Sequence, residues 1–193
     1  MDTKKFRDKI KGTSGLLSLE GSIALTIFIF LMLFLYSFLV FFEARNEIAH
    51  VLLTTTDSLA LDSFAGEMAD DNSLQGLVFK LYSNARPSNG TYTEGSKWYD
   101  SGNDTVQDTI RTRFLAYISG SDENEANKIL NSLHVVGGMN GLDFSGSYVE
   151  NGELHVKVRY TIEYEFNMFG FDSVELEQSA CSKMWNFSGG KGN

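Results

Sequence analysis

The sequence contains very little cysteine, proline or histidine. Its 193 residues include one Cys, one Pro and three His. A single cysteine cannot close an intramolecular disulfide, so the chain is not a disulfide-stapled small domain, and no Cys/His spacing suits zinc. Because 42% of the residues are hydrophobic, a collagen-like or wholly disordered chain is also excluded. The length fits one domain of ordinary size with room for an appendage.

A recognisable set of catalytic or ligand-binding residues is also lacking. The histidines His50, His134 and His155 are scattered along the chain. Cys181 could formally pair with one of them as a nucleophile, but a small residue in a terminal strand is the favoured interpretation. The segment GGMNG at 137–141 lacks the Lys-Ser/Thr of a phosphate loop and is typical of a turn, and no calcium loop is present. We therefore expect no enzyme activity, no catalytic residues, no cofactor and no metal site.

Charge is missing from one long stretch. No charged residue lies between Glu20 and Glu43, and residues 23–42 read IALTIFIFLMLFLYSFLVFF. At about 1.5 Å per residue, such a run spans roughly 30 Å as a helix, the thickness of the bilayer core. A buried core helix is the alternative, but a domain of this size rarely holds a helix that is apolar on every side. We predict a transmembrane span at about residues 22–42.

The charges on the two sides of this run differ. Residues 1–15 carry five bases and two acids, whereas residues 43–193 carry 22 acids and 11 bases. The positive-inside tendency places the N-terminus in the cytoplasm and the C-terminal part outside the cytoplasmic membrane. The acidic excess argues against a nucleic-acid partner. A removable secretory signal is disfavoured, because the apolar run is too long and no small-x-small cleavage site follows it.

The junction before the apolar run has a further feature. It reads GLLSLE, so that a glycine, Gly15, ends the basic leader and Glu20 follows at the fifth position. This resembles the class III signal of type IV pilin-like proteins, which a prepilin peptidase cuts after the glycine. The resemblance implies a cleaved leader of residues 1–15, a new N-terminus at Leu16, and a Glu20 carboxylate that faces the freed amine of a neighbouring subunit. The alternative is that Glu20 is an ordinary interfacial acid and Gly15 a linker glycine.

Longer stretches carry a wider resemblance. Residues 16–64 combine the apolar run with a polar continuation, EARNEIAHVLLTTTDSLALDSF; residues 174–185 read VELEQSACSKMW, and residues 137–147, GGMNGLDFSGS, look like the opening of a strand. These stretches are similar to TadE-like minor pseudopilins of Tad (Flp-type) pilus systems. The resemblance implies a non-enzymatic protein that takes part in assembly or initiation of a pilus. Its partners would be the lipid bilayer, other pilin-like subunits, Tad inner-membrane assembly proteins and prepilin peptidase.

This chain differs from that family in some details, and other classes of protein stay open. The apolar helix has no Leu-Pro, and Gly21 stands where fibre-forming pilins have Tyr, which favours the minor branch. A signal-anchored extracytoplasmic domain that binds a ligand or senses a signal would keep residues 1–15 and tolerate loss of Glu20. An anchored hydrolase would need a convergent pocket of titrating groups, which no spacing indicates.

The apolar run passes into an amphipathic pattern. We predict one continuous helix over 16–65, ending at Gly66, because apolar or small residues recur at three- and four-residue spacing; they are Phe41, Ala44, Ile48, Leu52, Thr55 and Leu59. An extracytoplasmic domain follows at 66–193. Within it the pattern predicts a helix at 104–119 with Asp104 as its N-cap, and others at 73–83 and 122–133. Residues 84–103 are predicted as a loop, in which Trp98 and Tyr99 form a short strand or a plug.

Strand signals dominate the last third of the chain. Residues 154–166 alternate between apolar and polar side chains, which predicts a half-buried antiparallel strand. The dipeptide Asn151-Gly152 is a two-residue hairpin signal that joins this strand to residues 142–149, and residues 174–185 would form a third strand. We expect an α+β, pilin-like fold in which a three-stranded antiparallel meander covers the amphipathic helix with its apolar face.

An aromatic cluster lies at the tip of the predicted second hairpin. Met168, Phe169 and Phe171 flank Gly170. If these side chains are exposed, they form a docking patch for a partner or the membrane. If they are tucked under the sheet, they belong to the core, which is the slightly favoured interpretation.

Overall fold

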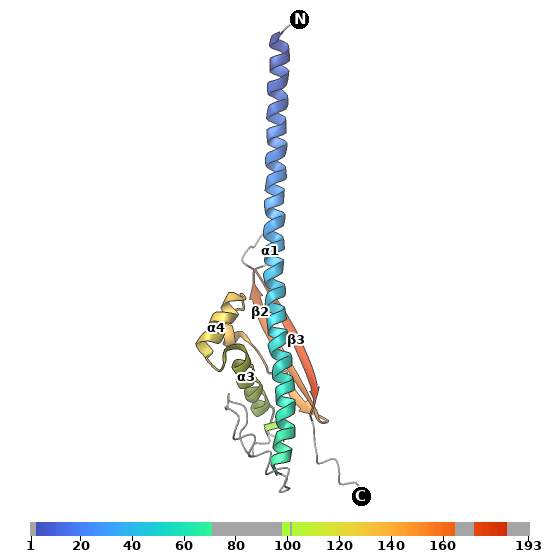
Figure 1. The fold of residues 1–193 in the computed structure, drawn as a ribbon, viewed down its shortest axis with the longest axis vertical. Helices are drawn as coiled ribbons and strands as arrows, with labels where there is room; N and C mark the ends of the chain where they lie inside the picture. The colour runs from blue at the N-terminus through green and yellow to red at the C-terminus, as the bar shows by residue number, and fades with distance from the viewer. Residues whose placement is uncertain (1–2, 71–97, 101, 165–171, 185–193) are drawn as a thin grey trace. The chain divides into compact units, whose positions relative to one another are not determined.

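The computed structural model describes residues 3–70, 98–100, 102–164 and 172–184, with side chains from residue 19 to 63 in the first of these ranges. The elements follow the order α1 (Thr3–Asp70), the 3₁₀ turn η1 (Trp98–Asp100), α3 (Asn103–Ser119), α4 (Glu123–Ser132), the 3₁₀ turn η2 (Gly138–Gly141), β1 (Tyr148–Glu150), β2 (Glu153–Glu163) and β3 (Ser173–Lys183) (Figure 1). The predicted α+β class is confirmed. The chain divides into two compact units, Met1–Val40 and Phe41–Asn193.

Helix α1 extends beyond the predicted helix at both ends. It begins at Thr3, within the basic leader, and ends at Asp70. The prediction that Gly66 ends the helix is therefore wrong. A glycine inside a helix costs only about 1 kcal/mol relative to alanine, which the long helix that precedes Gly66 can tolerate.

The C-terminal sheet is a three-stranded antiparallel meander of order β1-β2-β3, as predicted. Asn151 and Gly152 form the first turn with φ values of 53° and 77°. A type I′ turn requires positive φ at both central residues, which Asn and Gly tolerate best. This turn pairs Glu150 with Glu153 and fixes the register of the hairpin.

The first strand is shorter than predicted. Only Tyr148–Glu150 is regular strand, whereas residues 142–149 were expected to be. Asp143 makes an isolated bridge with Arg159, and Ser147 N then donates to the Phe144 carbonyl at 2.9 Å in a turn. Such a turn interrupts the ladder between the bridge and β1. Within residues 137–147, which resemble a strand opening of the TadE-like family, the 3₁₀ turn η2 occupies the first half.

The two faces of β2 differ as the alternation predicted. Its inward residues are at most 2% exposed: Leu154, Val156, Val158, Tyr160 and Ile162. They share one hydrophobic core with the predicted stripe of α1, in which Ala44, Ile48, Leu52 and Leu59 are buried. The expectation that the sheet covers this helix face is therefore confirmed. Each large apolar side chain buried in this way contributes about 1.5–3 kcal/mol.

One hydrogen bond ties the sheet directly to α1. Gln178 Nε2, on β3, donates to the Arg45 carbonyl oxygen at 3.0 Å. On the other side of the core, Arg113 of α3 reaches Ser58 and Asp62 of α1. The unit that begins at Phe41 is therefore held around the helix by polar contacts as well as by apolar burial.

Helix α3 confirms the predicted apolar face but not its cap. Val106, Ile110, Phe114 and Ile118 are buried. The helix begins at Asn103 after Gly102, and no side chain caps it, so the assignment of Asp104 as N-cap is wrong. Trp98, predicted in a short strand or a plug, is not in a strand: it lies in the 3₁₀ turn η1, and its side chain is buried in the core, as the plug alternative expects.

Residues 137–141 form the predicted turn. Gly141 is required there, because a Cβ on it would lie 1.8 Å from the Val136 carbonyl oxygen. Met139 N donates to Asn127 Oδ1 of α4 at 2.9 Å, which fastens the turn to that helix. The predictions for 73–83 and for most of 84–103 lie outside the described residues.

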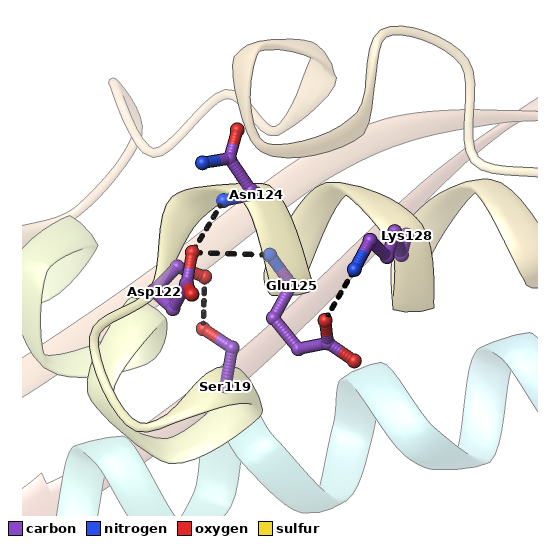
Figure 2. Close-up of polar contacts among 5 residues, drawn as sticks. All are labelled: Ser119, Asp122, Asn124, Glu125 and Lys128. Atoms are coloured by element: carbon purple, nitrogen blue, oxygen red, sulfur yellow. Dashed lines mark hydrogen bonds and ion pairs between the residues drawn. The ribbon is translucent and has the colours of Figure 1, made fainter.

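Helix α4 has a complete N-terminal cap (Figure 2). Asp122 Oδ1 accepts hydrogen bonds from Asn124 N at 2.9 Å and from Glu125 N at 3.3 Å. Ser119 Oγ donates to the Asp122 carbonyl oxygen at 2.7 Å, and Lys128 Nζ lies 2.9 Å from Glu125 Oε2. Two of the helix's otherwise unpaired amide groups are satisfied by one carboxylate.

Replacing Asp122 with Ala is expected to destabilise the unit by about 0.5–2 kcal/mol, because the two amides at the start of α4 lose their acceptor. Hydrogen exchange of the Asn124 and Glu125 amides should accelerate in the detergent-solubilised chain. The matched control is Asp122→Asn, whose amide oxygen can still accept both bonds. Equal protection in the Ala variant and the wild type would contradict this role.

Candidate functional site

The first candidate site is the apolar surface of α1. Between Leu19 and Phe42, most large apolar side chains are 41–68% exposed, whereas Leu33, Val40 and Phe41 are only partly exposed. In the described part of the chain, the segment Leu19–Ser63 is the one helix long and apolar enough to cross a membrane, and none of its most apolar window is buried. Continuous apolar surface of this extent marks a membrane or protein contact. The helix is consistent with a single-pass membrane anchor.

Two of the hydroxyl groups inside this surface are satisfied locally. Thr26 Oγ1 donates to the Ser22 carbonyl oxygen at 2.8 Å, and Ser37 Oγ donates to the Leu33 carbonyl oxygen at 3.1 Å. In hydrocarbon, unsatisfied polar groups cost several kcal/mol each, so a membrane helix must satisfy them internally. The local bonds therefore make this stretch compatible with a lipid or helix environment.

The predicted site residues at the start of this surface all lie in α1. Gly15 and Leu16 are helical in their backbone, and Glu20 is an exposed side chain just before the apolar run. Its carboxylate is thus accessible to a group from another molecule. Met168, Phe169 and Phe171 lie outside the described residues, so the two interpretations of that patch stay predictions.

A second candidate site lies on the outer face of the sheet. There β2 and β3 bring together Glu153, His155 and Cys181. Cys181 Sγ lies 3.9 Å from His155 Nε2 and 3.9 Å from Glu153 Oε2. His155 Nε2 lies 3.6 Å from Glu153 Oε2. His155 and Cys181 are direct partners in the antiparallel register.

The surroundings of this cluster orient the His155 ring and shift the pKa of the Cys181 thiol. The Tyr148 ring of β1 stacks on the His155 imidazole with centroids 4.7 Å apart and an interplanar angle of 16°. Partial desolvation and the Glu153 carboxylate raise the pKa of the Cys181 thiol. A cysteine nucleophile is activated by a lowered pKa, so Cys181 is not activated as the nucleophile of a hydrolase would be.

Sequence spacing did not predict this grouping. Glu153 and His155 are two residues apart in a strand, which places them on one face, but Cys181 joins them only through the pairing register of β3. The hairpin turn fixes β1 against β2, whereas the residues of the second connection gave no comparable turn signal. The cluster could have been predicted only from the pairing register of β3 with β2.

The rest of the outer face carries ion pairs. Lys157 Nζ lies 2.8 Å from Glu177 Oε1, and Arg159 Nε lies 3.2 Å from Glu177 Oε2. The hydrogen bond from Lys157, followed by the charges of Lys157 and Arg159, lowers the pKa of Glu177. These ion pairs are exposed to solvent and contribute little to the stability of the fold.

Comparison of the chain with models of protein families, with curated proteins and with solved structures finds no match. A functional assignment therefore depends on the two candidate sites themselves.

Proposed function

We propose that the protein is a TadE-like minor pseudopilin, a non-enzymatic single-pass membrane protein that takes part in assembly or initiation of a Tad-type pilus. One observation carries the proposal. Helix α1 has an apolar exposed segment that begins directly after a single acid, Glu20, and its later residues supply one wall of an α+β core. A helix that served only as a membrane anchor would need neither the acid at Glu20 nor a continuation into the core of the α+β unit.

The apolar part of α1 would pack laterally against helices of other pilin-like subunits in the membrane. Such association depends on van der Waals packing and polar contacts, because lipid chains are as apolar as the side chains. Glu20 would supply the polar contact by pairing with the N-terminal amine of a neighbour. The excess of bases in residues 1–15 supports an N-terminus in the cytoplasm and an α+β unit outside it.

Processing by prepilin peptidase would produce that amine. Cleavage after Gly15 would remove the basic leader and leave Leu16 as the new N-terminus. Gly15 lies inside α1, so the peptidase would have to open the helix at that point. A glycine makes this easier, because glycine in a helix interior is less stable than alanine by about 0.5–1 kcal/mol. The missing side chain would also let the backbone approach the active site closely.

The proposal predicts a defined change of mass. Co-expression with prepilin peptidase should reduce the mass of the membrane-bound protein by that of residues 1–15, and N-terminal sequencing should begin at Leu16. Gly15→Leu should block cleavage, because the larger side chain prevents the close approach. Gly12→Leu, in the same leader, is the matched control and should still be cleaved. An unchanged N-terminus in the presence of the peptidase would refute processing.

The same measurement separates the pseudopilin from a signal-anchored binding or sensing domain. That alternative keeps Met1 and the leader whether or not the peptidase is present. It also has no use for a carboxylate at Glu20, so a neutral variant would keep its function. The two proteins thus differ in both mass and variant phenotype.

A further inference from the structure

We propose that Glu153, His155 and Cys181 form a binding site for one zinc-class divalent cation on the outer face of the sheet. This proposal does not rest on the proposed function, since the site lies on β2 and β3 and uses no residue of α1. It offers three different ligand atoms, a carboxylate oxygen, an imidazole nitrogen and a sulfur. Zinc binds all three types of ligand, commonly as three protein ligands plus water.

The distances suit such an ion. The three contacts of 3.9, 3.9 and 3.6 Å join the same three atoms, Cys181 Sγ, His155 Nε2 and Glu153 Oε2. A point equidistant from all three lies about 2.2 Å from each, which is within the range of zinc–sulfur and zinc–nitrogen bonds. Closing the triangle by a few tenths of an ångström would lift the ion from the plane and leave a fourth, tetrahedral position for water.

The backbone that carries the cluster is a fully paired part of the sheet. The three residues lie on paired strands, and Met184 N donates to the Gly152 carbonyl oxygen at 2.8 Å beside them, which closes the ladder next to the first turn. The stack of Tyr148 on His155 holds the imidazole plane. Ligands that are held in place lose little conformational entropy on binding, so their geometry contributes directly to affinity.

The chemistry favours a borderline-soft cation over calcium or magnesium. Those hard ions take oxygen ligands, whereas sulfur and imidazole select zinc and related metals. Binding would convert the Cys181 thiol to a thiolate and release its proton to solvent. A bound cation would offset the repulsion between that thiolate and the neighbouring Glu153 carboxylate.

The test uses the full chain in detergent with a thiol-free reductant, and Zn²⁺ and Co²⁺ as probes. We expect one Zn²⁺ per chain, a thiolate-to-cobalt charge-transfer absorption with Co²⁺, and at least about a tenfold loss of affinity in Cys181→Ser and His155→Gln. His50→Gln and Glu175→Gln are the matched controls, and both should bind as the wild type does. Loss of binding in the controls, or no loss in the cluster variants, would overturn the site.

A second measurement needs no variant. Cys181 is the one cysteine of the chain, so alkylation by iodoacetamide reports on it alone. Stoichiometric Zn²⁺ should slow this alkylation at least about tenfold, and a chelator should restore the rate, because a metal-bound thiolate is a poorer nucleophile than a free one. An alkylation rate unchanged by Zn²⁺ would refute the site. So would a protein that binds no Zn²⁺ and forms only a disulfide-linked dimer through Cys181.

Discussion

Replacing Glu20 with Ala is expected to abolish assembly of surface filaments while the protein still inserts in the membrane. The apolar run would be unchanged, so insertion would be intact; a charge at the edge of hydrocarbon is the one feature removed. What would be lost is the partner of the freed amine on the neighbouring subunit. Electron microscopy of cells and immunoblotting of membrane fractions measure the two outcomes separately.

The size of this effect follows from the electrostatics. Two unit charges about 4 Å apart interact by about 4 kcal/mol at an effective dielectric constant of 20, and desolvation of both groups offsets part of this. A net 1.4 kcal/mol per contact already changes an association constant tenfold. Because a filament repeats the contact at every subunit, even a modest loss per contact is enough to prevent growth.

The matched control is Glu43→Ala. Glu43 is the acid at the other end of the apolar run and is also exposed on α1, but it has no amine to meet in the proposed assembly. We expect filaments to form normally in this variant. Intact filaments in Glu20→Ala, or equal defects in both variants, would contradict the assembly role and favour an anchored domain of another function.

Sequence patterns predicted the elements that are determined by residues close together in the chain. The alternation of β2 and the Asn151-Gly152 turn were sufficient for the first hairpin, because the period of two and the positive φ values leave few other structures. The apolar spacing of α1 and α3 likewise identified their buried faces. The end of α1 and the cap of α3 were missed, because Gly66 and Asp104 are favourable at helix ends without being confined to them.

Features that depend on distant residues were not predictable in this way. The Glu153–His155–Cys181 cluster requires the register of β3, because Cys181 lies 28 residues along the chain from Glu153. The contact between α3 and α1 requires two helices to meet that are more than 30 residues apart in the sequence, since α1 ends at Asp70 and α3 begins at Asn103. No sequence period encodes either of these, so the cluster and the α3–α1 contact were found only from the structure.

That contact between α3 and α1 has a large predicted effect on stability. The Arg113 side chain is 5% exposed and pairs with the Asp62 carboxylate, which is 21% exposed, and it also donates to Ser58 Oγ. Arg113→Leu would leave the Asp62 charge without this partner in a largely buried position. Removing one member of a buried pair costs about 3–5 kcal/mol, and partial exposure of Asp62 reduces the expected loss to about 2–4 kcal/mol.

The loss should depend on pH in a defined direction. Burial raises the pKa of Asp62 even though Arg113 opposes this, and removal of Arg113 would raise it further. The folded variant then binds more protons than the unfolded chain at pH values between the two pKa values of this carboxyl. Its stability therefore falls as pH rises through that window and is best retained below the unfolded pKa of about 3.9. The variant should be less destabilised near pH 4 than at pH 7.

Urea denaturation of the detergent-solubilised full chain measures these changes in stability. Fluorescence of the buried Trp98 is the probe, and all variants carry Trp185→Phe so that Trp98 is the one tryptophan that is observed. The double variant Arg113→Leu/Asp62→Leu should be more stable than Arg113→Leu, because it leaves no unpaired carboxyl. Arg111→Leu is the matched control: that side chain is 43% exposed, so its loss should change stability by no more than about 0.5 kcal/mol. If Arg113→Leu and Arg111→Leu were equally stable, the pair would not hold α3 against α1, and apolar burial alone would account for their packing.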